Sequence, residues 1–370
     1  MTESSSPSEI DLLAPMRMRL VLLLVAGSIL SVLVVGVVTS RHAQIPPNSS
    51  VKNVPLSVSC AGPTFCAAVD DQGRATTFNG TSWAAPTLLH VPSMTTVDCP
   101  GVSFCLAGDI NGSVFVLRGH RWSRVQKVDT ASAGLLNAFG MNGITAISCT
   151  SDEHFCLVGD VRGRILTYSG SGWSPPAGLL SPADYAVDRP AGLAAVVGVS
   201  CPTARFCAAA TVSGRALTWN GTSWSAPQLL TSPDPAGLRG LVHLPEIVGI
   251  SCASPRFCAA IHPTGYVQRF DGNTWSAPQP IDTGGVQTGN HEGLTAVSCP
   301  TPDFCMAVDD GGRALAYNGS AWASPIQVDP TLGLTDVSCP TPRFCVALDE
   351  LGNAAVFDGH GWTPPQRIDA

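Results

Sequence analysis

The sequence contains few charged residues, few aromatic residues and almost no lysine. Asp, Glu, Lys and Arg together make up 13% of the 370 residues, aromatic residues make up 6%, and Lys52 and Lys127 are the only lysines. This charged share is about half that of an average soluble domain, so long solvated helices are not expected. The net charge of −7 also argues against nucleic-acid binding, which uses basic faces.

Sequence motifs of common enzymes are missing as well. The chain has no G-x-S-x-G, P-loop or H-E-x-x-H motif, and no G-x-G-x-x-G that follows a strand. Each of these motifs places a nucleophile, a phosphate cradle or a metal at a defined turn or helix. We therefore predict no catalytic residue, no cofactor and no metal.

Only one long apolar run is present, at residues 20–38, and it contains no charge. At 1.5 Å rise per residue, such a run spans a hydrocarbon core of about 30 Å. A cleaved signal peptide has a shorter apolar region and a small-x-small cleavage site, for which Val38-Thr39-Ser40 is a weak candidate. We expect a cytoplasmic segment at 1–19, a single transmembrane anchor or uncleaved signal at 20–39, and a tether at 40–54.

The rest of the chain, residues 55–370, repeats one unit seven times. Each unit runs from a strand ending at a first Cys, through Phe-Cys, to a turn containing Gly and then to Trp. The first Cys and the Trp are 23 residues apart in six units and 24 in the third. The repeat tryptophans are Trp83, Trp122, Trp173, Trp224, Trp275, Trp322 and Trp362. Such a fixed period identifies a repeat architecture.

Each unit is predicted to form four strands. In the sixth unit these are residues 294–299, 304–309, 313–318 and 321–328, with turns at Asp309-Asp310-Gly311-Gly312 and Asn318-Gly319. Gly in these turns suits a positive φ, and Asn-Gly is a strong hairpin signal. Seven four-stranded units predict an all-β, seven-bladed β-propeller with one blade per repeat. The aspartates of the first turn are expected to bond backbone N–H groups, and the tryptophans to pack between blades.

The fourteen cysteines fall into one close pair per unit. The pairs are Cys60 with Cys66, Cys99 with Cys105, Cys149 with Cys156, Cys201 with Cys207, Cys252 with Cys258, Cys299 with Cys305, and Cys339 with Cys345. The simplest interpretation is a disulfide within each blade, because zinc sites favour C-x2–4-C pairs with four convergent ligands. Paired cysteines require an oxidising compartment. The propeller is therefore expected outside the cytoplasm, with the N-terminus inside.

The string Ser338-Cys339-Pro340-Thr341-Pro342-Arg343-Phe344-Cys345 resembles a Cys-containing propeller repeat of exported and membrane-anchored actinobacterial proteins. The repeats are more loosely similar to those of sialidase-type and WD40/YVTN-like propellers. The resemblance covers about residues 55–370 and implies the propeller fold. It implies no catalytic residue.

The repeats differ most in the connections between blades. From each Trp to the next Cys the chain runs 16, 27, 28, 28, 24 and 17 residues, so four consecutive connections carry insertions. In a propeller these connections share one face, and loops on a rigid scaffold often carry function. The candidate ligand-binding residues are Asp129, Asp184, Tyr185, Asp188, Arg189, Arg239, His243, Glu246, Asn290, His291 and Glu292. The alternative is that the inserts only cover the channel mouth or lengthen strands.

These observations favour a non-catalytic binding or scaffold module, held in the membrane by residues 20–39. Its expected partner is an envelope polysaccharide or an exported protein. One alternative is a propeller-type glycoside hydrolase or lyase, which needs two carboxylates roughly 5–10 Å apart. Another is a sensory ectodomain coupled to a partner in the membrane.

Overall fold

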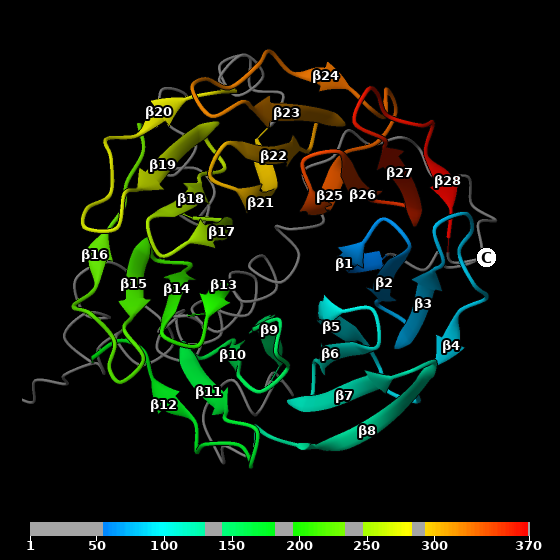
Figure 1. The fold of residues 1–370 in the computed structure, drawn as a ribbon, viewed down its shortest axis with the longest axis vertical. Coiled ribbons are helices and arrows are strands. Elements are labelled where there is room, and N and C mark those ends of the chain that lie inside the picture. The colour runs from blue at the N-terminus through cyan, green and yellow to red at the C-terminus, as the bar shows by residue number, and fades with distance from the viewer. Residues whose placement is uncertain (1–54, 130–142, 182–194, 234–246, 283–292, 369–370) are drawn as a thin grey trace, which may run out of the picture. The chain divides into compact units, whose positions relative to one another are not determined.

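The computed structural model describes residues 55–129, 143–181, 195–233, 247–282 and 293–368. Within these ranges the chain forms seven four-stranded antiparallel sheets arranged in a ring (Figure 1). The predicted all-β, seven-bladed propeller is thus confirmed. The described ranges contain no helix long and apolar enough to cross a membrane, and the anchor predicted at 20–39 lies outside them.

Each blade uses four strands that are consecutive in the chain, here named a to d from the centre outwards. Strand a is β1 (Pro55–Gly62), β5 (Met94–Gly101), β9 (Ile144–Cys149), β13 (Val196–Thr203), β17 (Gly249–Ser254), β21 (Leu294–Thr301) or β25 (Leu334–Thr341). Strand b is β2 (Phe65–Asp70), β6 (Phe104–Asp109), β10 (Cys156–Asp160), β14 (Phe206–Thr211), β18 (Phe257–Ile261), β22 (Phe304–Asp309) or β26 (Phe344–Asp349). Strand c is β3 (Arg74–Phe78), β7 (Ser113–Arg118), β11 (Arg164–Tyr168), β15 (Arg215–Trp219), β19 (Tyr266–Phe270), β23 (Arg313–Tyr317) or β27 (Asn353–Phe357). Strand d is β4 (Thr87–Leu88), β8 (Arg121–Lys127), β12 (Ala177–Gly178), β16 (Gln228–Leu229), β20 (Gln279–Pro280), β24 (Ile326–Gln327) or β28 (Gln366–Arg367).

The hydrophobic core is divided into layers that lie between neighbouring blades. One layer joins the first and second blades through Val69, Met94 and Phe115, and six similar clusters were found among the described residues. Strand b is covered by a neighbouring blade on both of its faces, so nearly all of its residues are buried. This explains why its sequence is a continuous apolar run rather than an alternating one.

The outermost strand departs from the prediction. A continuous strand was predicted over residues 321–328, but the structure has only an isolated bridge between Tyr317 and Trp322 and then the two residues of β24. Pro325 lies between them. Proline has no N–H to give to the ladder, so it interrupts the strand. In the same blade, strand b matches its predicted bounds, strand a runs two residues further to Thr301, and strand c ends one residue earlier.

All seven predicted disulfides are formed, one between strands a and b of each blade, and no cysteine is free. Their Cα–Cα distances are 3.9–4.1 Å. The bonds join Cys60 to Cys66, Cys99 to Cys105, Cys149 to Cys156, Cys201 to Cys207, Cys252 to Cys258, Cys299 to Cys305, and Cys339 to Cys345. The predicted pairing is confirmed in every blade.

The depth of these disulfides was not predicted from the sequence, which only placed them around the hairpin between strands a and b. The second cysteine of each pair lies on strand b, between two blades, and is closed off from solvent. Its exposed fraction is 1% for Cys156 and 0% for Cys66, Cys105, Cys207, Cys258, Cys305 and Cys345. These cysteines are therefore part of the core between blades and are not accessible to a ligand.

The tryptophans also join blades. In the first blade Trp83 packs on Phe78 of strand c, with ring centroids 5.4 Å apart. The ring of Phe78 in turn stacks on Phe344 of the seventh blade at 6.3 Å. Phe270 in the fifth blade makes the same pair of contacts, with Trp275 and with Phe206. The predicted packing role of the tryptophans is confirmed, since all seven pack against the layers between blades. In the first, fifth and sixth blades an aromatic ring of strand c passes this contact on to a neighbouring blade.

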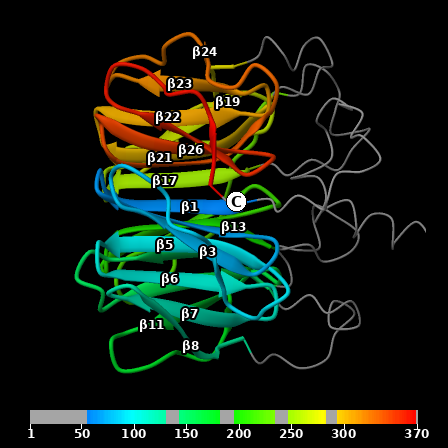
Figure 2. The same cartoon turned by 90° about the vertical axis from the view of Figure 1, so that its right-hand side faces the viewer.

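The ring closes by packing between its first and last blades. Strand β1 contacts β25 and β26, yet each sheet contains strands from one repeat only. Figure 2 views the ring from the side, where β1 and β5 of the first two blades lie next to each other. The ring is therefore closed by blade packing and not by a strand shared between the two ends of the chain.

Candidate functional site

The turns between strands b and c lie on one face of the ring, here called the connection face, because strand d ends and the next strand a begins there. In the sixth blade, Asp309 Oδ1 accepts hydrogen bonds from the N–H groups of Gly311 and Arg313, at 3.0 and 2.8 Å. Gly312 adopts a φ of 76°, as predicted for this turn. Asp70, Asp109, Asp160 and Asp349 make the equivalent bonds in their blades. The predicted turn role of these aspartates is confirmed.

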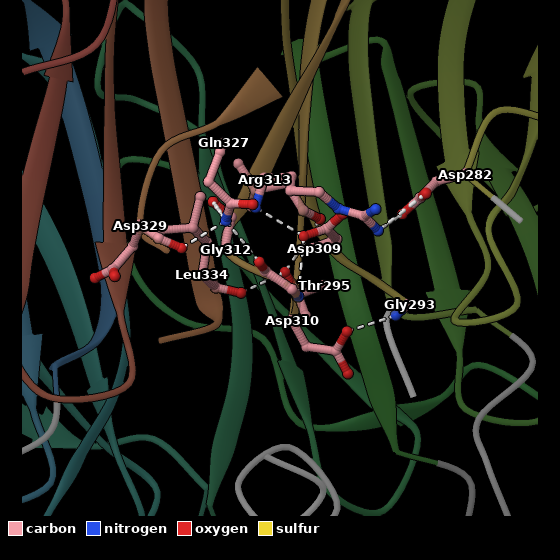
Figure 3. Close-up of polar contacts among 12 residues, drawn as sticks. Asp282, Gly293, Thr295, Asp309, Asp310, Gly312, Arg313, Gln327, Asp329 and Leu334 are labelled. Atoms are coloured by element: carbon pink, nitrogen blue, oxygen red, sulfur yellow. Dashed lines mark hydrogen bonds and ion pairs between the residues drawn. The ribbon is translucent and has the colours of Figure 1, made fainter. Parts of the chain in front are cut away.

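An arginine at the start of strand c connects two blades at this face (Figure 3). Arg313 donates to Asp309 of its own turn at 2.7 Å and to Asp282, at the end of the preceding strand d, at 3.0 Å. Arg164 makes the same two contacts with Asp160 and Asp129. The carboxylates are almost fully buried, and burial raises the pKa of Asp160 although Arg164 opposes the shift.

The seventh blade replaces this arginine by Asn353. Its side-chain amide donates to Asp349 Oδ2 at 2.6 Å. Asp329, at the end of the preceding strand d, instead accepts the N–H and hydroxyl of Thr331, each at 2.7 Å. Burial, with a further contribution from Asp329, raises the pKa of Asp349. At the start of strand c, the amide of an asparagine can therefore replace the guanidinium of the arginine as the partner of the turn aspartate.

Of the predicted ligand-binding residues, the structure describes only Asp129. It is completely buried and bonded to Arg164 at 2.7 Å, so it joins the second blade to the third. Asp184, Tyr185, Asp188, Arg189, Arg239, His243, Glu246, Asn290, His291 and Glu292 lie outside the described residues. The residues that flank these segments do reach the connection face. For example, the N–H of Gly293 bonds Asp310 Oδ1 at 2.6 Å in the turn of the sixth blade.

A polar channel runs through the centre of the ring. It encloses about 360 Å³ and is lined by strand a of all seven blades. The residue directly before the first cysteine lines the channel in six blades, as a serine in five of them and as Asp98 in the second blade. The channel wall also carries the hydroxyls of Thr95, Thr145 and Thr295. The described lining residues include two carboxylates, Asp98 and Asp336, and no basic side chain.

These side chains form a closed circle of hydrogen bonds from blade to blade. Each oxygen accepts the N–H of the first cysteine in the next blade, at 2.7–3.0 Å. The acceptors are Ser59, Asp98, Ser148, Ser200, Ser251, Ser298 and Ser338, and the donors are Cys99, Cys149, Cys201, Cys252, Cys299, Cys339 and Cys60 respectively. Each of these side chains thus fixes the position of the neighbouring disulfide.

The two channel carboxylates lie on either side of the first blade. Asp98 Oδ1 is 3.4 Å from the hydroxyl of Ser59, and Asp336 bonds the hydroxyl of Ser57 and the N–H of Val58, the latter at 2.8 Å. Burial raises the pKa of each carboxyl to about 6, against the lowering effect of these hydrogen bonds. Because the two serines are two residues apart on one strand, they are about 7 Å apart. Both carboxyls therefore face the same channel from the two neighbours of the first blade.

Neither channel aspartate was predicted from the sequence. The signal was available, because Asp98 occupies a position that is serine in the other six repeats. The lengths of the connections between blades do not reveal Asp98. Aligning strand a of the seven repeats residue by residue does reveal it. The position of the two carboxylates makes the channel the best candidate site in the described part of the chain. No three His, Cys, Asp or Glu side chains meet there, or elsewhere in the described ranges, as a metal site would require.

Comparisons with known proteins support the fold and go no further. No family model and no curated protein matches the chain. The structure is similar to the computationally designed Ika8 protein, with a TM-score of 0.54 and 12% identity over 85% of this chain and 87% of that chain. It is also similar to YCF48 bound to D1 peptide, with a TM-score of 0.58 and 13% identity over 83% of this chain and 93% of that chain. The chain therefore belongs, by its fold, to the β-propellers, and it is a seven-bladed one with a disulfide in every blade.

Proposed function

We propose that this protein is an extracytoplasmic, non-catalytic binding or scaffold module that residues 20–39 hold in the membrane. The disulfides support the location, because bonds of this kind persist in oxidising compartments. The ring supports a binding role, since disulfides brace each blade, and hydrogen bonds and aromatic contacts join neighbouring blades, so the binding surfaces are fixed in place.

The observation that carries the proposal is the polar channel. A wall of hydroxyls and carboxylates offers hydrogen bonds to a polyhydroxylated ligand, which pairs its own hydroxyls with such groups. The candidate residues of the inserted connections would extend this surface at the connection face. An envelope polysaccharide is therefore the ligand that we favour over an exported protein.

The test is co-sedimentation of the full chain with protein-stripped envelope polysaccharide. We expect binding that weakens in Asp98→Ser, which removes a channel carboxylate but keeps a side chain that six blades already use. Shortening the segments around Tyr185 and His243 tests the inserted connections separately. Arg343→Ala, an exposed change at a residue that does not line the channel, is the control. Full binding by all of these variants would place the ligand elsewhere, and an absence of binding would favour a protein partner.

A glycoside hydrolase or lyase is the second candidate, and the two channel carboxylates favour it. Glycosidases use an acid with a raised pKa and a second carboxylate roughly 5–10 Å away. Asp98 and Asp336 have raised pKa values of about 6 and share the channel. Released reducing sugar that disappears in both Asp98→Asn and Asp336→Asn would support this candidate. Hydrolysis that survives both changes would reject it.

A further inference from the structure

The outer edge of a propeller blade is an open sheet edge. An edge strand presents unpaired N–H and C=O groups to which another chain can add, and proteins block such edges with proline, charge or short strands. Six of the seven blades here have a proline at the third residue after the repeat tryptophan. These prolines are Pro86, Pro176, Pro227, Pro278, Pro325 and Pro365. In all six, the outer strand that remains is two residues long.

The second blade is the exception within the described residues. Val125 replaces the proline, and β8 runs for seven residues from Arg121 to Lys127. It pairs with β7 from Arg118↔Arg121 to Ser113↔Lys127, with one bulge between the pairs at Phe115 and Val114. In Figure 1 β8 is the outermost strand of its blade. The exposed residues of β8 include Arg121, Ser123, Gln126 and Lys127. Among the residues that the structure describes, no strand pairs with the outer side of β8, so its edge is open on both sides of the bulge.

The edge is also basic. Residues 118–127 contain Arg118, Arg121, Arg124 and Lys127, and they contain no acidic residue, although the chain as a whole carries a net charge of −7. Two such edges repel each other, which disfavours pairing between copies of this chain. An acidic strand is attracted to the same charges. The charge of the edge therefore disfavours pairing with β8 of a second copy and favours pairing with an acidic strand.

We propose that β8 is a docking edge, to which an extended acidic segment of another polypeptide adds as a fifth strand of the second blade. In strand addition, backbone hydrogen bonds give affinity and the flanking side chains give selectivity. Here Arg121 to Arg124 supply the regular run of backbone groups before the bulge, and Arg121 and Lys127 supply the selectivity. Arg118 lies 3.6 Å from Glu153 and is already partly compensated. This surface is separate from the channel, so it does not depend on the glycan-binding proposal.

The experiment uses the full chain and two libraries of N-acetylated eight-residue peptides. Both alternate a charged residue with Val, Ile, Thr or Tyr; the charged residue is Glu in one library and Lys in the other. Binding is followed by fluorescence anisotropy. Hydrogen exchange of the β8 amides reports where the peptide binds. We expect the Glu library alone to bind and to slow exchange in β8.

Val125→Pro is the decisive variant, because it gives the second blade the proline that the other six blades accommodate. We expect it to fold normally and to bind the Glu library at least tenfold more weakly. Val125→Thr, which keeps the N–H and the strand propensity, is the matched control. Arg121→Glu with Lys127→Glu keeps the backbone edge and should also weaken binding at least tenfold, which separates charge from strand addition.

Several results would overturn the proposal. Unchanged binding by Val125→Pro would show that the peptide does not add to the edge. Equal binding of the Lys library would show that charge does not select the partner. Self-association of the full chain that Val125→Pro abolishes would assign the edge to a second copy. Affinity weaker than about 1 mM for both libraries would leave the edge without the proposed partner.

Discussion

Arg313 is the residue whose removal tests the packing of the connection face most directly. It is the shared cation of two buried carboxylates, Asp309 and Asp282, which belong to neighbouring blades. The arginine side chain is 20% exposed, whereas the carboxylates are exposed by 0% and 2%. Arg313→Ala leaves both carboxylates in place and removes the charge that compensates them.

The expected loss is worked from these contacts. Removing one partner of a buried ion pair destabilises a protein by about 3–5 kcal/mol. The partial exposure of Arg313 places the expected loss at the lower end, near ~3 kcal/mol. Arg313→Asn copies the arrangement of the seventh blade, where Asn353 donates to Asp349. It keeps a hydrogen bond to Asp309, so we expect it to lose only about half as much.

The assay is urea unfolding of the full chain near pH 7, followed by tryptophan fluorescence. Arg343→Ala, an exposed change, should alter the unfolding free energy by less than about 0.5 kcal/mol. Adding Asp282→Asn to Arg313→Asn should recover part of the loss, because the neutral asparagine side chain no longer needs the guanidinium charge. An Arg313→Ala variant no less stable than Arg343→Ala would refute the reasoning. Equal losses for the Ala and Asn variants would show that the asparagine does not substitute for the guanidinium.

Three further predictions concern the channel, the disulfides and the closure of the ring. The pKa of Asp98 is about 6 in the folded protein against an ordinary value of 3.8, so its ionisation lowers stability as the pH rises from about 4 to 6. Asp98→Ser should therefore gain about 1 kcal/mol at pH 7 and nothing at pH 4 in urea unfolding; a gain independent of pH would contradict this interpretation. Replacing Cys299 and Cys305 together by Ala should cost at least roughly 2 kcal/mol under oxidising conditions, as expected for a short closed loop, and less relative to the reduced parent, which lacks the cross-link but keeps both buried sulfur atoms. Phe78→Ala should cost about 3 kcal/mol in calorimetry or urea unfolding, because that ring joins the first blade to the last, and a loss below about 1 kcal/mol would show that closure does not depend on it.

The repeat period was enough to predict most of the fold. The constant spacing from Cys to Trp determined seven blades, and the turn glycines and aspartates placed strands b and c within one residue in the sixth blade. Strand d was predicted too long, because the apolar residues around Pro325 were taken for strand. The missing N–H of that proline decided the local structure instead.

The candidate site was less predictable. The serine of strand a looks like an ordinary polar residue in the sequence, because its partner is a backbone N–H about 40–50 residues away in the next blade. Asp98 and Asp336 become neighbours of one strand only when the ring closes between the first and last blades. The role of Asp129 was similarly hidden, since Arg164 reaches it from the following repeat.

Every sheet of this ring comes from one contiguous stretch of chain, so no junction between two blades depends on where the chain begins or ends. The seam between β25 and β1 is held by the same kinds of contact as the other six, with Ser338 bonding Cys60 where Ser59 bonds Cys99. Circular permutants that start at any blade should thus assemble the same propeller, provided that a linker joins Arg367 to Pro55. The gene could then begin with any of the seven repeats, while each blade would still contact the same two neighbours.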